Sequence, residues 1–111
     1  FSDYLDRVRA LIKRHWSYPC VKNADTRGCE YKTGVLVIEF GILRNGQLGF
    51  VELHQSSGYS IMDDFAQNAI KLASPFPAIP AALLQNRKGA GLPILARFNY
   101  VVETGLTNVI R

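Results

Sequence analysis

The sequence predicts a small α+β domain in which two helices cover one face of a three-stranded antiparallel sheet. Three observations support this: an amphipathic helical pattern at the start, two apolar runs joined by Asn45-Gly46, and a second helical pattern followed by an alternating strand. The predicted order is α-β-β-α-β. With 111 residues, 48% of them hydrophobic, the chain is long enough for one globular domain.

The first predicted helix spans about Asp3 to Trp16, with Ser2 as a suitable N-cap. Its apolar residues recur every four positions, at Tyr4, Val8, Ile12 and Trp16. Four basic residues lie mostly off this stripe, at Arg7, Arg9, Lys13 and Arg14. We interpret them as an ordinary solvated face, with an electrostatic patch as the alternative. Pro19 ends any continuation.

The strongest local signal is a hairpin. Residues 20–33 are predicted to form a loop, Gly34–Leu43 a strand, and Leu48 to about Gln55 its partner. Asn45-Gly46 predicts a two-residue turn with positive φ at both positions. In that register, Leu43 lies opposite Leu48, Phe40 opposite Val51 and Ile38 opposite Leu53. Glu39 then lies opposite Glu52, a like-charge pair that is tolerable only on a solvent-facing side.

The second half of the chain predicts one helix and one strand. Ser60 to Asp63 resembles a capping box, and the helix runs to about Ala73. Its predicted apolar face consists of Ile61, Phe65, Ala69 and Leu72, with Met62, Ala66, Ile70 and Ala73 beside them, and the small alanines suggest a close approach to the sheet. Extended chain with three prolines follows, then a short turn at 81–84 and a loop at 86–91. The last strand spans about Leu92 to Glu103, and 104–111 form a tail. The first strand is apolar on both faces, so the expected sheet order is second, first, third.

The composition disfavours several functions. The net charge is +4, but the basic residues are scattered, which argues against nucleic-acid binding. The longest apolar runs have four residues, far below the roughly 20 of a membrane-spanning helix. Neither histidine lies at metal-site spacing from the cysteines, and no catalytic constellation stands out. We therefore predict a binding module with no catalytic residue, metal or cofactor.

The two cysteines, Cys20 and Cys29, are separated by eight residues. They either form a disulfide that closes a short loop or are two unrelated thiols. The polar, loop-like segment between them favours the disulfide slightly. The chain opens with Phe1 rather than Met, so we expect it to be a piece of a longer protein.

Several motifs resemble the C-terminal domain of the TonB family, the periplasmic energy transducers of Gram-negative bacteria. In chain order they are Trp16-Ser17-Tyr18-Pro19, the strand Gly34 to Phe40, Asn45-Gly46, Ser56-Ser57-Gly58, Ser74-Pro75-Phe76-Pro77 and Phe98-x-Tyr100. Their order and spacing carry the likeness, and residues 1–103 would form the domain. The segment from Cys20 to Thr33 is longer than in the family. The sibling TolA C-terminal domain, an envelope-integrity module, shares part of the pattern and is the alternative.

The resemblance implies a function and a location. The protein would sit in the periplasm, anchored in the inner membrane by an N-terminal helix outside this sequence and coupled to ExbB and ExbD. It would bind the TonB box of an outer-membrane transporter and so transmit proton-motive force to the uptake of iron-siderophore or cobalamin. The oxidising periplasm would also favour the bond between Cys20 and Cys29.

We expect the partner to bind by strand addition at the edge of the last strand. The partner-binding residues predicted there are Leu95, Arg97, Asn99 and Val101, and the resemblance adds Tyr18 and Pro19. The alternative is that the tail, or a second copy of the domain in a homodimer, covers this edge. An unrelated enzyme or small-ligand module on the same frame is a third interpretation, and it would require a deep polar pocket.

Overall fold

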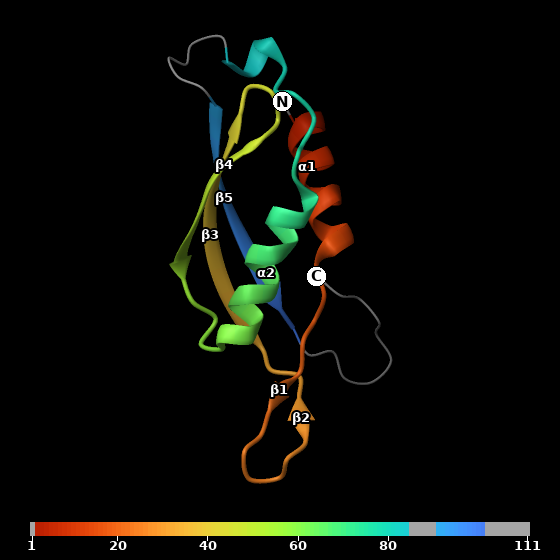
Figure 1. Cartoon of the computed structure of the whole chain (residues 1–111), viewed down its shortest axis with the longest axis vertical. Helices are drawn as coiled ribbons and strands as arrows, with labels where there is room; N and C mark the ends of the chain where they lie inside the picture. Colours follow the sequence, from red (N-terminus) through yellow and green to blue (C-terminus); the bar gives the residue numbers. More distant parts are fainter. Residues whose placement is uncertain (1, 85–90, 102–111) are drawn as a thin grey trace.

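Two helices lie side by side on one face of a three-stranded antiparallel sheet (Figure 1). The structure is a computed structural model that describes residues 2–84 and 91–101. The helices are α1 (Ser2–His15) and α2 (Ser60–Ala73). The strands are β3 (Gly34–Leu43), β4 (Leu48–Gln55) and β5 (Gly91–Tyr100), in the order β4-β3-β5. The predicted fold class and sheet order are confirmed. The predicted tail and residues 86–90 of the predicted loop lie outside the described residues.

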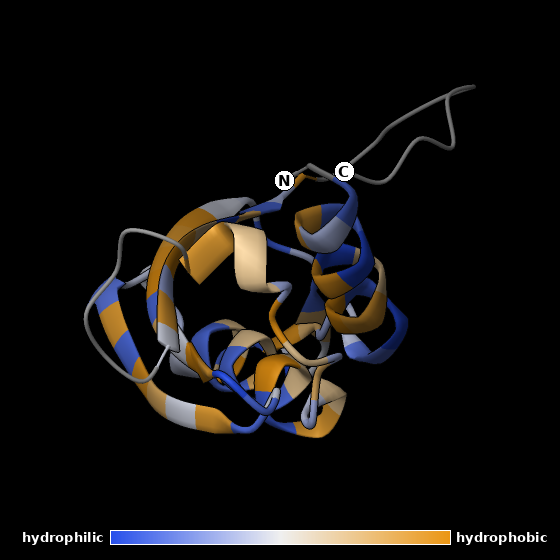
Figure 2. Ribbon diagram, turned by 90° about the horizontal axis from the view of Figure 1, so that it is seen from above, coloured by the Kyte–Doolittle hydropathy of each residue, from blue (hydrophilic) through white to orange (hydrophobic). Residues whose placement is uncertain are grey.

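The core lies between the sheet and the helices. Alternate residues of β3 point inward and are fully buried, namely Leu36, Ile38, Phe40 and Ile42. Seen along the long axis, the sheet curves around the helices, and apolar and polar residues alternate along it (Figure 2). No helix among the described residues is long and apolar enough to cross a membrane.

Residues 74–84, which follow α2, pack along the hairpin turn. The 3₁₀ helix η1 (Ala81–Leu84) forms the short turn predicted at 81–84. Before it, the Phe76 amide donates to the Gly46 carbonyl over 2.8 Å, and the Phe76 ring stacks on Phe40 with centroids 6.0 Å apart. A Cβ at Gly46 would lie 1.9 Å from the Phe76 carbonyl oxygen, so the glycine permits this close approach.

The β3–β4 register is confirmed in its middle and wrong at its turn. Phe40 pairs with Val51 and Glu39 with Glu52, as predicted. Nearer the turn, Leu48 pairs with Ile42 and not with Leu43. The Gly46 amide donates to the Leu43 carbonyl, and the Leu43 amide to that of Gln47, which closes a three-residue loop. Only Gly46 of the Asn45-Gly46 pair has a positive φ, so the turn is of the kind that ends in a glycine bulge.

The buried face of α2 is rotated from the predicted one. Its buried residues are Met62, Asp63, Ala66, Ala69, Ile70 and Ala73. Ile61, Phe65 and Leu72, expected inside, are 38%, 38% and 64% exposed. Small alanines let α2 approach its neighbours closely, and this turns the bulkier side chains toward solvent.

Asp63 does not complete a capping box. The N-cap of α2 is Tyr59, which makes no side-chain capping hydrogen bond. The buried Asp63 carboxylate instead accepts hydrogen bonds from both Ser56 and Ser57 hydroxyls and from the Ser57 amide, the last over 2.9 Å. The Ser56-Ser57-Gly58 turn is thus fixed to α2 by a buried carboxylate.

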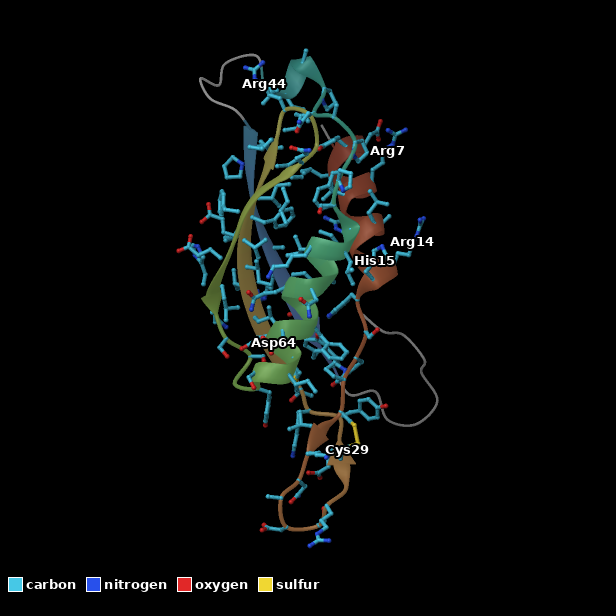
Figure 3. The ribbon with its side chains drawn as sticks, viewed as in Figure 1. Arg7, Arg14, His15, Cys29, Arg44 and Asp64 are labelled. Carbon is cyan, nitrogen blue, oxygen red and sulfur yellow. A yellow bond between two sulfur atoms is a disulfide. The ribbon has the colours of Figure 1, made fainter. Side chains whose placement is uncertain are left out.

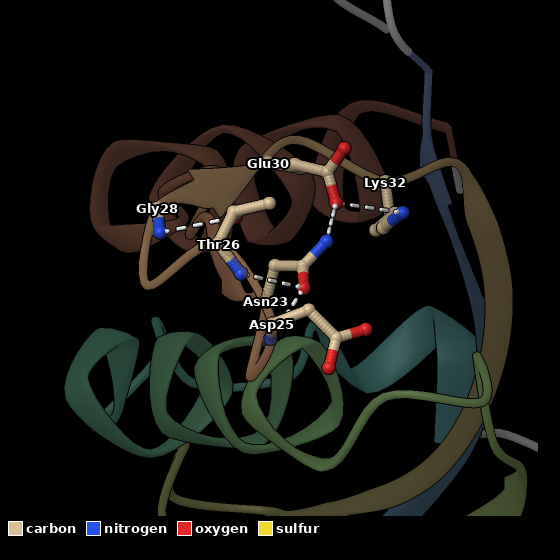
Figure 4. Close-up of polar contacts among 6 residues, drawn as sticks. All are labelled: Asn23, Asp25, Thr26, Gly28, Glu30 and Lys32. Atoms are coloured by element: carbon tan, nitrogen blue, oxygen red, sulfur yellow. Dashed lines mark hydrogen bonds and ion pairs between the residues drawn. The ribbon is translucent and has the colours of Figure 1, made fainter.

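The segment predicted as a loop contains a small hairpin that projects beyond the sheet (Figure 1). Its strands are β1 (Val21–Lys22) and β2 (Cys29–Glu30). A disulfide joins Cys20 to Cys29 across its base, with the Cα atoms 5.4 Å apart (Figure 3). At the tip, Asn23 accepts from the backbone of Asp25 and Thr26 (Figure 4). Hydrogen bonds from Asn23 and then Lys32 lower the pKa of Glu30.

Candidate binding groove along the edge of β5

A groove of about 420 Å³ runs between α1 and the edge of β5. Its size falls within the range of ordinary ligand pockets. The lining from α1 consists of Leu5, Val8, Arg9, Ile12 and Lys13, with Trp16 just beyond the helix. The lining from the sheet consists of Phe40 and residues 94–99. Among the described strands, β5 pairs with β3 alone, so its other edge opens onto this groove.

The helical and strand periodicities of the sequence build the groove walls. The four-residue spacing of α1 turns Val8 and Ile12 toward the sheet, where both are buried. On β5, alternation points Phe98 inward with Ile94 and Ala96, while Leu95 and Arg97 face outward and are exposed. The apolar floor is therefore made by the inward-facing residues, and the strand backbone forms its rim.

Trp16 closes one end of the groove through aromatic contacts. Its ring meets Phe98 and Tyr100 edge to face, with centroids 5.3 and 5.1 Å apart. Its Nε1–H donates to the Tyr100 hydroxyl over 2.7 Å, and that hydroxyl donates to the Met62 carbonyl over 3.2 Å. Burial raises the pKa of Tyr100 to about 12. These contacts link the end of α1, the start of α2 and the end of β5.

The direction in which each β5 residue points its N–H and C=O groups follows from the hydrogen bonds of β3. Leu43 directs both its N–H and its C=O toward the β4 side, and the Val35 carbonyl accepts from the Gln55 amide group on the same side. In an antiparallel sheet, successive residues of a central strand form their main-chain hydrogen bonds alternately with the strand on one side and the strand on the other. Odd-numbered residues of β3 therefore face β4, and even-numbered ones face β5.

The β3–β5 register is continuous from Gly34↔Tyr100 to Leu43↔Gly91. The β5 residues opposite the odd-numbered residues of β3 therefore direct their N–H and C=O groups away from β3. They include Leu95, Arg97 and Asn99. Pro93 also lies opposite an odd-numbered residue of β3, so its missing N–H removes no hydrogen bond from the sheet. The free edge offers peptide donors and acceptors at every second residue.

The rim of the groove is basic. Arg9 and Lys13 line it from α1 and Arg97 from β5. Arg9 meets Asp6 at 3.5 Å, but both side chains are about two-thirds exposed, so this pair contributes little. Among the described residues, no ion pair joins Lys13 or Arg97 to a carboxylate. Arg7 and Arg14 project away from the sheet (Figure 3).

The structure gathers some of the predicted site residues and separates others. Leu95, Arg97 and Asn99 line the groove, whereas Val101 lies just beyond β5 and is 39% exposed. Tyr18 and the buried Pro19 lie outside the lining. The Tyr18 ring instead packs edge to face between Tyr31 and Tyr100, and its hydroxyl donates to the Lys32 carbonyl. Tyr18 therefore fastens the disulfide hairpin to the domain.

Sequence reasoning missed the contribution of α1 to this site. It assigned Arg9 and Lys13 to a solvated face, although both line the groove. A signal was present, because Leu5, Arg9 and Lys13 recur every four residues beside the apolar stripe. Only the position of β5 shows that this second stripe faces a sheet edge.

The groove is suited to binding more than to chemistry. None of its described lining residues is a serine, cysteine, histidine or carboxylate. Aliphatic and aromatic side chains, three cations and an asparagine offer contact area and hydrogen-bond donors. An extended peptide could pair with β5 and place every second side chain between the sheet and α1.

Comparison with known proteins relates this architecture to one family. The family model described as "TonB C terminal" matches residues 1–90. Two solution structures of the Helicobacter pylori TonB C-terminal domain share the fold, with TM-scores of 0.67 and 0.59 at 20% and 19% identity. They cover 95% and 92% of this chain, and the chain covers 86% and 97% of theirs.

The HasB C-terminal domain is similar over 88% of this chain and 69% of its own, with a TM-score of 0.52 and 26% identity. A comparison with curated protein sequences found no match. The family match favours the TonB interpretation over the TolA alternative. Domains of this family are periplasmic, non-enzymatic parts of energy transducers. The chain belongs to the TonB C-terminal family.

Proposed function

We propose that this domain binds the TonB box of an outer-membrane transporter by strand addition at the edge of β5. The proposal rests on the alternating direction of the peptide groups along β5. The N–H and C=O groups of Leu95, Arg97 and Asn99 are not paired with β3 and lie beside an apolar groove. Main-chain hydrogen bonds give affinity with little demand on sequence. One domain could then serve several transporters.

In the same proposal, the domain is the periplasmic end of a longer protein anchored in the inner membrane and driven by ExbB and ExbD. The grip on the transporter would transmit proton-motive force for uptake of iron-siderophore or cobalamin. The family assignment supports the energy-transducing role and an outer-membrane transporter as the partner.

We also infer from the groove which residue types the bound strand carries. Its core-side residues would be apolar, because they enter a groove floored by Phe40, Ile94 and Phe98. An acidic residue would be favoured near the basic rim of Arg9, Lys13 and Arg97. Lys13→Glu should weaken binding of such a peptide at low salt, whereas Arg14→Glu, on the same helix but pointing away, should change it far less (Figure 3).

A proline scan of β5 tests the proposal with a transporter-derived peptide and isothermal titration calorimetry. Proline at 95, 97 or 99 removes an outward N–H and should leave the domain folded, as Pro93 does. Binding should weaken at least tenfold, which corresponds to about 1.4 kcal/mol. Proline at 96 or 98 should break the β3–β5 pairing and destabilise the fold.

Asn99→Ala is the matched control, because it removes the side chain and keeps the peptide N–H. It should bind more tightly than Asn99→Pro. If prolines at 95, 97 and 99 all leave both folding and affinity unchanged, strand addition at this edge is wrong. If instead the free protein is a dimer that these prolines dissociate, a second copy covers the edge.

A further inference from the structure

Three ligand-type side chains meet on the solvent-facing side of the sheet, on the face opposite the helices. They are Glu39 on the central strand β3 and Glu52 and His54 on β4. One donor atom from each lies within 4.8 Å of the other two. The binding function proposed above uses none of these residues, and they do not line the groove.

The backbone brings the three side chains together. Glu39 and Glu52 are direct cross-strand partners, so both project from the same face. A register shift follows them: Ile38 pairs with Leu53 but Val37 pairs with Gln55, which leaves His54 as the extra residue of a bulge. The His54 Nε2 lies 2.9 Å from the Glu39 Oε1. Rigid strands therefore hold two of the three ligands in register.

The electrostatics of this cluster favour a cation. Two carboxylates directly opposite each other on neighbouring strands destabilise a sheet. Among the described residues, no lysine or arginine forms an ion pair with Glu39 or Glu52. A bound divalent ion would replace this repulsion by attraction to both carboxylates.

We propose that Glu39, Glu52 and His54 form a Zn²⁺ site in which water occupies the remaining coordination position. Zinc accepts imidazole nitrogen and carboxylate oxygen at about 2.0 to 2.2 Å, and sites with three protein ligands and one water are common. Ligand atoms around one tetrahedral ion lie about 3.4 Å apart at those bond lengths. Glu39 is half-buried and Glu52 exposed, and small rotations of the two side chains on the solvent-facing side would bring their oxygens from the observed spacing to this distance. Mg²⁺ and Ca²⁺ prefer oxygen ligands alone, so the imidazole selects against them.

The test is calorimetric titration of Zn²⁺ into untagged, disulfide-bonded protein in a non-chelating buffer. Both cysteines of the sequence are in the disulfide, so no thiolate competes for the metal. We expect one saturable site, with backbone amide shifts in the NMR spectrum confined to β3 and β4 around residues 39, 52 and 54. His54→Gln and Glu52→Gln should each weaken zinc binding at least tenfold. Mg²⁺ should give no saturable signal.

His15→Gln is the matched control, because it removes the other histidine, which lies on α1. It should bind zinc as the wild type does. Glu52→Gln relieves the like-charge pair, so without metal it should unfold at the same temperature or higher, which separates loss of a ligand from loss of the fold. The proposal is overturned if zinc shows no saturable binding, if His15→Gln weakens it as much as His54→Gln, or if Mg²⁺ binds equally well.

Discussion

The indole Nε1–H of Trp16 donates a 2.7 Å hydrogen bond to the hydroxyl of Tyr100, 84 residues further along the chain. The bond joins the residue that follows α1 to the last residue of β5. Because α1 forms one wall of the groove and β5 the other, this contact sets how far the walls stand apart at that end. Both residues belong to motifs that carry the family resemblance.

Tyr100 should make the stability of the domain fall at high pH. Burial raises its pKa from 10.0 to about 12, so between these values the unfolded chain loses a proton that the folded protein keeps. Stability is full below pH 10 and declines as the pH rises toward 12, by about 2 to 3 kcal/mol for this residue. Urea unfolding followed by Trp16 fluorescence at pH 8, 10 and 11.5 measures the slope.

Tyr100→Phe should reduce that slope to the part contributed by Tyr4 and Tyr18, whose pKa values burial also raises. It should also lower stability at pH 7 by about 1 to 3 kcal/mol, because the Trp16 donor loses its acceptor. Tyr31→Phe, at an exposed position, serves as the control. A Tyr100→Phe variant with an unchanged slope would show that Tyr100 is not the titrating group.

Phe40→Ala should cost about 3 to 5 kcal/mol of unfolding free energy. Phe40 is 1% exposed and stacks on Phe76, so the truncation leaves a cavity between the sheet and the chain after α2. Phe50→Ala, on the opposite face of the same hairpin and 44% exposed, should cost only about 1 kcal/mol. Equal losses in urea unfolding would mean that the hairpin faces are assigned wrongly.

Asp63→Ala should destabilise the domain by about 2 to 4 kcal/mol, because it leaves the Ser57 amide and two serine hydroxyls without their acceptor. Asp64→Ala, one residue on and exposed, should change stability by less than about 0.5 kcal/mol. Thermal unfolding of the two variants side by side gives the comparison. A similar effect for both would assign the loss to first-turn charge on α2 rather than to the buried carboxylate.

Cys20 and Cys29 should be oxidised in protein purified from the periplasm. In the chain-entropy model, closing a loop of about ten residues contributes roughly 2 to 3 kcal/mol. Alkylation followed by mass spectrometry, with and without reductant, counts the free thiols. Two alkylated cysteines in freshly purified, unreduced protein would rule out the native bond.

The disulfide variant tests the hairpin separately from the groove. Cys20→Ser with Cys29→Ser should lower stability while leaving peptide binding at β5 unchanged, because neither cysteine lines the groove. A loss of binding at a temperature where the variant remains folded would show that the hairpin contributes to the partner site.

Local pattern was enough to predict the order of the two helices and of the three strands of the main sheet, the central strand and the middle of the hairpin register, but it missed the small hairpin of β1 and β2. A shift of the β3–β4 register by one residue would move every β3 side chain to the other face of the sheet. The apolar set of Leu36, Ile38, Phe40 and Ile42 is therefore compatible with one register. Alternation also marked Leu95, Arg97 and Asn99 as outward-facing. The bond directions of β3, however, were needed to show that their peptide groups face outward as well.

Features that depend on two distant segments were decided only by the tertiary structure. The buried face of α2 was mispredicted because α1 and the sheet select the small alanines for close approach, whereas hydrophobicity alone ranks Phe65 and Leu72 higher. Asp63 matched a local capping pattern, but the Ser56-Ser57 turn supplied better donors. Arg9 and Lys13 became part of a site because β5, more than 80 residues later, lies beside α1. The sequence by itself determined which residues can be apolar partners, and packing decided which of them meet.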